Sequence, residues 1–91
     1  MNEIIYETEI DIKSKSHDLK ILPKYFEAVV AGIKRFELRK NDRNFQVGER
    51  ITLREWDGEK FTGRNIVYII TYVLEDCPEY GLKDGYCIIG F

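Results

Sequence analysis

The sequence predicts an α+β fold in the form of a small mixed β-barrel, with about six strands and one main helix over about residues 23–32. Most of the chain alternates apolar and polar residues, the period of two that is typical of half-buried strands. Only one stretch has the apolar spacing of a helical face. A chain of 91 residues is also the size of a single domain.

The helix is predicted from the residues at its ends and along one side. Pro23 suits the first helical position, where its missing N–H leaves no hydrogen bond unmade. Apolar residues then recur with helical spacing from Phe26 to Ile33. Gly32 is expected to end the helix, because glycine readily adopts the left-handed conformation found there. A helix this short does not stand alone, so we expect it to pack on a sheet.

The strands are expected where alternating segments lie between turn residues. Asp57 and Gly58 form a strong hairpin signal. Phe26, Phe36 and Phe61 lie on apolar faces and are expected in the core. The six expected strands cover residues 4–12, 18–22, 34–40, 49–56, 61–74 and 86–91.

The charges are unevenly distributed, although the net charge is only −2. Residues 1–12 carry four acids and no base, whereas residues 13–50 carry ten lysines and arginines against five acids. Residues 51–91 carry four bases and seven acids. A basic middle is compatible with one positive face that meets phosphates, and equally with charges scattered over a solvated surface.

The composition argues against several kinds of site. No apolar stretch approaches the ~18 residues of a membrane-spanning helix. The first residues also lack the apolar segment of a signal peptide, so we expect a cytoplasmic protein without a membrane partner. Cys77 and Cys87, with His17 as the single histidine, are too few for the usual four-ligand metal site. We therefore expect no metal, and the lack of a phosphate-binding glycine motif argues against a nucleotide cofactor.

The richest stretch for chemistry is residues 32–43, which hold five cations, two carboxylates and an amide. Arginines in such a cluster can donate paired hydrogen bonds to a phosphate. Glu37 can accept a hydrogen bond from the exocyclic amine of a base. A salt-bridged, solvated strand face accounts for the same pattern without any ligand, and the periodicity leaves both interpretations open.

The motif Gly32-x-Lys34-x-x-Glu37-x-Arg39, followed by residues 47–49 and a strand, resembles the ASCH signature of the PUA-like superfamily. The resemblance covers residues 17–91. Residues 1–16 are therefore expected to form an N-terminal extension containing a strand, and residues 17–91 an ASCH, PUA-like domain. Further blocks resemble a branch of short bacterial and phage proteins known as a domain of unknown function. These blocks are residues 17–23, 25–26, 39–43, 61–64 and 81–86.

The resemblance implies a PUA-like β-barrel with a basic and polar cleft that binds RNA or a nucleotide-like ligand. We expect the cations of the cleft to meet phosphate or carbonyl oxygens, and its carboxylate and amide to contact a base edge. Aromatic residues beside cations at segment ends are candidates for stacking on a base. The expected ligand-binding residues are His17, Lys20, Lys34, Glu37, Arg39, Asn41 and Arg43, and the stacking candidates are Tyr25, Phe45 and Trp56.

Two other functions stay open beside this binding module. Some ASCH-like proteins are hydrolases that remove the acetyl group of N4-acetylcytidine with a lysine, a threonine and a glutamate. Lys34 matches that lysine, whereas Glu37 stands at the threonine position. A small hydrolase acting on a modified nucleoside or RNA, with Lys34 and Glu37 as candidate catalytic residues, is therefore the alternative. A third hypothesis is a phage or mobile-element accessory protein that binds a host protein through an acidic N-terminal strand.

Overall fold

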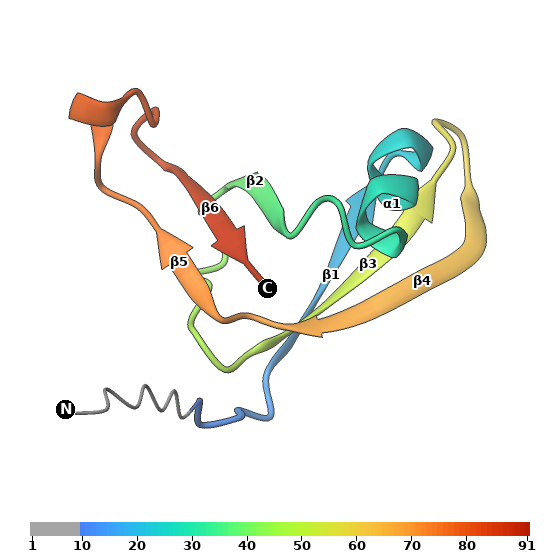
Figure 1. Ribbon diagram of the computed structural model, residues 1–91, viewed down its shortest axis with the longest axis horizontal. Coiled ribbons are helices and arrows are strands. Elements are labelled where there is room, and N and C mark those ends of the chain that lie inside the picture. Colours follow the sequence, from blue (N-terminus) through green and yellow to red (C-terminus); the bar gives the residue numbers. More distant parts are fainter. Residues whose placement is uncertain (1–9) are drawn as a thin grey trace, which may run out of the picture.

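The structure is a computed structural model and describes residues 10–91. These residues form six strands, one α-helix and one 3-10 helix, arranged as two three-stranded sheets (Figure 1). The first sheet has the order β1 (Ser16–Ile21), β3 (Arg50–Trp56), β4 (Phe61–Ile69). The second has the order β2 (Phe36–Lys40), β6 (Tyr86–Gly90), β5 (Tyr72–Leu74). The helices are α1 (Pro23–Val30) and η1 (Pro78–Tyr80).

The first sheet contains the only parallel strand pair found among these six strands. Strand β1 runs parallel to β3, while β4 and every pair of the second sheet are antiparallel. A parallel pair needs a long crossover connection, and here the chain between β1 and β3 holds α1 and β2. This connection places β2 in the second sheet, where it lies close to the outer edge of β1.

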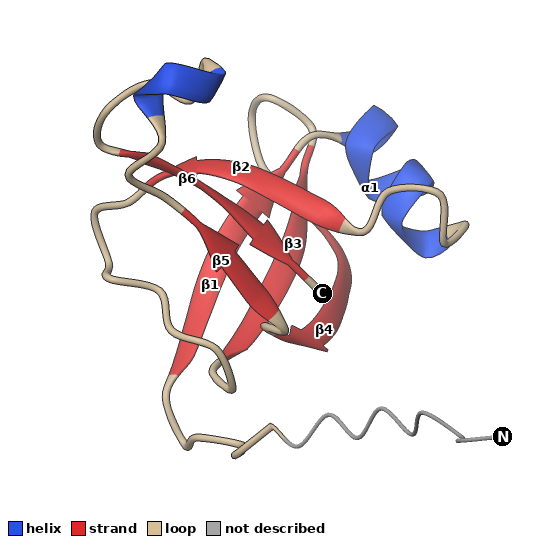
Figure 2. Ribbon diagram, turned by 60° about the vertical axis from the view of Figure 1, so that its left-hand side comes forward, coloured by secondary structure: helices blue, strands red, loops and turns tan. Residues whose placement is uncertain are grey.

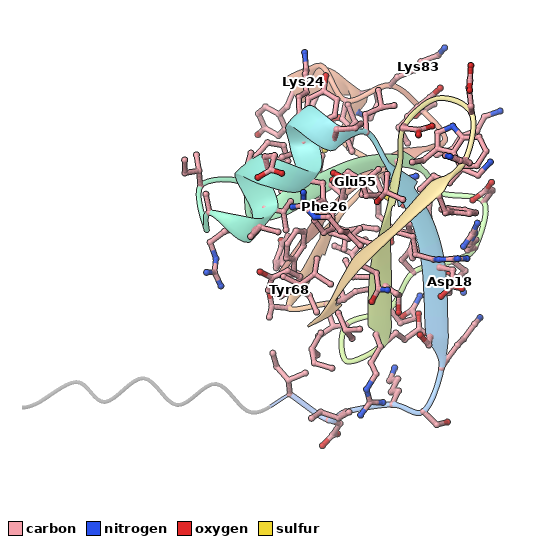
Figure 3. All side chains as sticks on the ribbon, turned by 90° about the vertical axis from the view of Figure 1, so that its right-hand side faces the viewer. Asp18, Lys24, Phe26, Glu55, Tyr68 and Lys83 are labelled. Carbon is pink, nitrogen blue, oxygen red and sulfur yellow. The ribbon has the colours of Figure 1, made fainter. Side chains whose placement is uncertain are left out.

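The hydrophobic core lies between the two sheets and helix α1 (Figure 2). The first sheet contributes Ile51 and Leu53, which point inward as their alternation predicts. The second sheet contributes Ile89, and the helix contributes Phe26 and Val29. Phe26 lies beneath α1, facing the first sheet (Figure 3). The helix thus packs on a sheet as expected, because it buries one apolar side.

The expected α+β barrel is wrong for residues 10–91, which form a mostly β structure without a closed barrel. Strands account for 43% of the described residues and helices for 13%. On one side the backbone does join the two sheets. The N–H of Ile70 donates to the carbonyl of Glu49, directly before β3 of the first sheet, and the N–H of Thr71 donates to that of Gly90 in β6 of the second. We call this passage of the chain from the first sheet to the second the sheet switch. Because of it, the expected single strand over 61–74 is two strands, β4 and β5.

On the other side, side chains replace backbone pairing between the edges of β1 and β2. The Arg39 guanidinium donates to the carbonyl oxygen of Lys20, and Arg43 donates to that of Asp18 at 2.7 Å. Asp18 and Lys20 are alternate residues of β1, so both carbonyls lie on one strand edge. We call these two contacts the arginine seam. A barrel would have a backbone ladder at this place.

Helix α1 ends earlier than its sequence predicts. Its last helical residue is Val30, and Gly32 follows with a left-handed φ of +74°. Val30 and Ile33 are exposed, so the apolar side of the helix covers less of the core than the spacing suggests. Among residues 10–91 no helix is long and apolar enough to cross a membrane.

The expected N-terminal strand over residues 4–12 lies mostly outside the described residues. Residues 10–15 form no strand and run as a loop against the turn before β3. The N–H of Lys13 donates to the carbonyl of Gly48 at 2.9 Å, and the N–H of Gly48 donates to Ile70. The loop and the sheet switch therefore meet at Gly48.

Gly48→Ala is expected to lower the free energy of unfolding by about 2–3 kcal/mol. Gly48 has a φ of +93°, and a Cβ there would clash with the backbone carbonyl of Asp11. Gly58→Ala is the matched control, because Gly58 has a φ of +105° with open space around it. Urea unfolding of both variants separates the cost of the clash with Asp11 from the cost of placing alanine at a positive φ. Equal losses would contradict the packing of the N-terminal loop on Gly48.

Candidate functional site

Strand β2 turns charged residues inward and apolar residues outward. Glu37 is only 5% exposed, whereas its neighbour Phe36 is 48% exposed and Leu38 is also exposed. The prediction that Phe36 belongs to the core is therefore wrong. Inner faces of sheets normally hold apolar side chains, and a buried carboxylate needs cationic or hydrogen-bonding partners. The inner face of β2 is thus the first place where a polar site is built.

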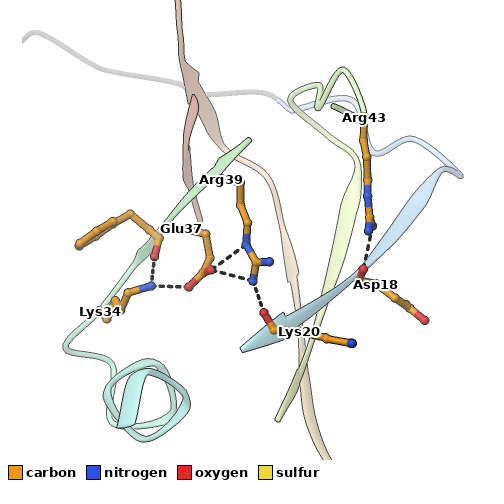
Figure 4. A network of polar contacts seen from close by, with 7 residues as sticks. Asp18, Lys20, Lys34, Glu37, Arg39 and Arg43 are labelled. Carbon is orange, nitrogen blue, oxygen red and sulfur yellow. Dashed lines mark hydrogen bonds and ion pairs between the residues drawn. The ribbon is translucent and has the colours of Figure 1, made fainter. Parts of the chain in front are cut away.

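Glu37 is held between two cations (Figure 4). Its Oε1 accepts from Lys34 Nζ, which also donates to the carbonyl of Phe36. Its Oε2 accepts from Arg39, at 3.1 Å from Nε and 3.0 Å from Nη2. Arg39 also makes one contact of the arginine seam, so the network runs from the end of the α1–β2 loop to the edge of β1.

A pocket of about 360 Å³ opens on one side of this network. Its walls are the rings of Tyr25 and Phe36 and the side chain of Leu38, while Lys34 and Glu37 supply the polar groups. We call it the aromatic pocket. Ligand pockets usually combine such apolar walls with a few polar groups that fix orientation.

A second pocket, of about 250 Å³, opens on the other side. We call it the basic pocket, because four of its seven lining residues are cations and only one is an acid. Arg39 lines this pocket and Glu37 lines the first, so their ion pair separates the two. The basic pocket is lined by Asp18, Leu19, Lys20, Arg39, Arg43, Arg54 and Phe61.

Two cations of the basic pocket lie directly opposite each other in the first sheet. Lys20 on β1 pairs in register with Arg54 on β3, and like charges in that relation destabilise a sheet. Lys20 Nζ lies 4.1 Å from the ring centre of Trp56, and the Arg54 guanidinium lies 3.9 Å from that of Phe61. Arg54 approaches the carboxylate of Asp18 only to 4.0 Å. An anion between the two cations would relieve their repulsion.

His17 lies outside both pockets. It is 5% exposed, its Nε2 lies 2.9 Å from Glu49 Oε1, and its ring packs against Phe45. The N–H of Gln46 donates to the same Glu49 oxygen at 2.8 Å. Burial acts to raise the pKa of Glu49, but the hydrogen bonds from His17 and Gln46 outweigh it and lower the pKa below its usual 4.5. This pair belongs to the core and not to a ligand cleft.

The other predicted residues divide between the pockets and the rest of the fold. Lys20, Lys34, Glu37, Arg39, Arg43 and Tyr25 come together around the two pockets. Trp56 lies beneath Lys20 at the margin of the basic pocket and packs edge-on against Phe61. Phe45 is 2% exposed, so it has no open face for a base. Asn41 donates to the carboxylate of Glu75 and lines neither pocket.

Six lining residues were not among those predicted from the sequence. The sequence does mark Arg54 as a possible site residue, because it lies at an outward position of an alternating strand, two residues before Trp56. Its placement beside Lys20 depends on the parallel pairing of β1 with β3, which no local pattern indicates. The six residues are Asp18, Leu19, Phe36, Leu38, Arg54 and Phe61.

Residues 10–91 contain two cysteines and one histidine. No group of three or more histidine, cysteine, aspartate or glutamate side chains there is arranged to hold a metal ion. Cys77 and Cys87 are buried, free thiols, and burial raises the pKa of Cys87.

Residues 16–91 match the family described as Domain of unknown function (DUF3850), and the chain belongs to that family. The chain is also similar to the "Uncharacterized 12.9 kDa protein in GpA 3'region" of Escherichia phage P2. The two are 44% identical over 62 residues, which is 68% of this chain and 57% of the relative. The chain therefore spans a little over half of that relative's length. The expected membership of a domain family of unknown function with a phage relative is confirmed.

Proposed function

We propose that the chain is an RNA- or nucleotide-binding module whose cleft consists of the aromatic and basic pockets. The observation that carries this proposal is their adjacency across the Glu37–Arg39 ion pair. A nucleotide likewise combines a flat, largely apolar base with a charged phosphate. The two halves of such a ligand match the two kinds of pocket.

The aromatic pocket is suited to a base. Tyr25 on α1 is exposed enough to stack on a ring, and Phe36 on β2 has about half of its surface exposed. Base stacking on an aromatic side chain contributes about 1–3 kcal/mol. The carboxylate of Glu37 and the ammonium of Lys34 then offer an acceptor and a donor for polar atoms of the base.

The basic pocket is suited to phosphates. Arg39 and Arg43 already donate to backbone carbonyls, whereas Lys20 and Arg54 have few partners among the described residues. These two cations repel each other until an anion binds between them. The resemblance of Gly32-x-Lys34-x-x-Glu37-x-Arg39 to the ASCH signature supports the same proposal.

Binding is favoured over hydrolysis by the contacts of the two candidate catalytic residues. Lys34 donates to both the Phe36 carbonyl and the Glu37 carboxylate, so it is held as a hydrogen-bond donor. Glu37 in turn accepts from two cations. A general base takes a proton onto an oxygen that must then give up its ion pair, and both oxygens of Glu37 are ion-paired, whereas a hydrogen bond accepted from a base leaves those ion pairs in place.

RNA affinity is expected to fall steeply with salt and to depend on the basic pocket. Lys20→Gln and Arg54→Gln should each weaken binding of a short single-stranded RNA about 5–10-fold and lower the salt slope by about 0.7. Tyr25→Ala should weaken binding at all salt concentrations without changing the slope. Fluorescence anisotropy with a labelled oligonucleotide, at low and at physiological salt, measures all three effects.

Lys83→Gln is the matched control for these variants. Lys83 is an exposed lysine that lies well away from Asp18 of the basic pocket (Figure 3). This variant should bind like the unaltered protein. Equal affinity at low and physiological salt, or an equal loss in Lys83→Gln, would contradict phosphate binding in the basic pocket.

A further inference from the structure

The outer face of the second sheet is apolar and, in the described part of the chain, is open except where residues 81–83 lie beside Leu38 and Tyr86. Strand register aligns its side chains in two rows across β2, β6 and β5. One row is Phe36, Gly90 and Tyr72, and the next is Leu38, Ile88 and Leu74. The four large end residues of these rows are between 39% and 64% exposed. The opposite face of the same sheet, with Ile89 and Glu37, is buried.

The size of this face matches what a protein dimer needs. With ~200 Å² for a large side chain, the four end residues leave roughly 400 Å² of mostly apolar surface exposed. A standard interface removes about 800 Å² per partner, of which about 65% is apolar in homodimers. The face therefore supplies most of the apolar area of one half of such an interface.

The charges at the rim of the face are complementary to those of a second copy. Lys40 is the last residue of β2. It lies two residues beyond Leu38, on the same face of the strand, and is exposed. Asp76 lies two residues beyond Leu74, in the bend that follows β5 and with a left-handed φ of +54°, and is also exposed. A two-fold axis parallel to β6 would place β2 of one copy over β5 of the other. Lys40 would then meet Asp76 of the second copy, twice in each dimer.

We propose that this outer face pairs with the same face of a second copy of the chain, around a two-fold axis along β6. Two sheets pack face to face in this way in β-sandwiches, with interdigitating side chains. Leu38 would lie over Leu74 of the other copy, and Phe36 over Tyr72. Because Phe36 and Leu38 also line the aromatic pocket, the second copy would form an additional wall of that pocket.

Sedimentation equilibrium across a wide dilution series of the full chain tests this proposal. The unaltered protein is expected to reach twice the chain mass of 10.8 kDa. Leu74→Lys should raise the dimer dissociation constant at least about 100-fold, because the buried charge occurs twice per dimer. RNA binding by the unaltered protein, measured separately by fluorescence anisotropy, distinguishes a failure of the dimer from a failure of the proposed function.

Val67→Lys is the matched control, because Val67 is a similarly exposed aliphatic residue on the outer face of the first sheet. Circular dichroism checks that each variant is folded. Lys40→Asp and Asp76→Lys should each weaken the dimer, and the double variant should restore it. A protein that stays monomeric throughout the series would overturn the proposal. So would a dimer that dissociates with Val67→Lys and persists with Leu74→Lys.

Discussion

Glu37→Ala is expected to lower the free energy of unfolding by about 2–3 kcal/mol and to weaken RNA binding in the folded fraction. The substitution leaves the Lys34 ammonium and the Arg39 guanidinium near each other without their shared counter-ion. Removing one partner of a fully buried pair costs about 3–5 kcal/mol. The two cations are 16% and 24% exposed, so water screens part of the loss. Urea unfolding measures the stability, and anisotropy measures the binding.

Glu27→Ala is the control for this prediction. Glu27 also pairs with an arginine, Arg64, at 2.8 Å, but both side chains are at least half exposed. Such surface pairs contribute about 0–1 kcal/mol, so this variant should be nearly as stable as the unaltered protein. If Glu37→Ala and Glu27→Ala lowered the free energy of unfolding by the same small amount, Glu37 would not be the centre of a buried network.

Glu49→Ala is expected to destabilise the fold by about 3 kcal/mol, because it leaves the buried His17 ring and the part-buried N–H of Gln46 without their acceptor. His17 Nε2 and the N–H of Gln46 both contact Glu49 Oε1. Glu49→Gln keeps the shape and one acceptor oxygen, so its loss should be smaller. Urea unfolding of the two variants and the unaltered protein at neutral pH tests the order.

The same carboxylate makes stability depend on pH. The pKa of Glu49 in the folded protein lies below its usual 4.5, so the unfolded chain binds the proton more readily. Its stabilisation is therefore complete above pH 4.5 and is lost as pH falls through the lower, folded-state pKa. Unfolding measured along a falling pH series should show the difference between Glu49→Gln and the unaltered protein shrinking. A difference that stayed constant would contradict the lowered pKa.

Local features of the fold were predictable from the sequence because they depend on neighbouring residues. The alternation around Ile51 and Leu53 identifies a strand and its inner face, and both residues are buried. Pro23 marks the first residue of α1. The cluster around Lys34, Glu37 and Arg39 is local too, since all three lie within six residues of chain. These side chains therefore meet whatever the larger topology is.

Features that depend on distant partners were predicted less well. The closed barrel is wrong because the edges of β1 and β2 are joined by arginine side chains, and alternation does not reveal which strand edges pair. Phe36 was expected inside because it lies on an apolar face of its strand, yet the next residue, Glu37, is the buried one and Phe36 points outward. Arg54 joins the site only through the parallel register of β1 and β3. His17 was expected at the cleft, but its partner Glu49 lies far along the chain.

The arginine seam also affects how copies of the protein associate with one another. A free strand edge offers unpaired carbonyl groups to any strand of another chain, which makes it a site for aggregation. On β1 the carbonyls of Asp18 and Lys20 are already occupied by Arg43 and Arg39. An approaching strand would have to displace both guanidinium groups and then accept two cations beside its backbone. The open side of the fold is thereby protected against edge-to-edge association, although no strand from residues 10–91 covers it.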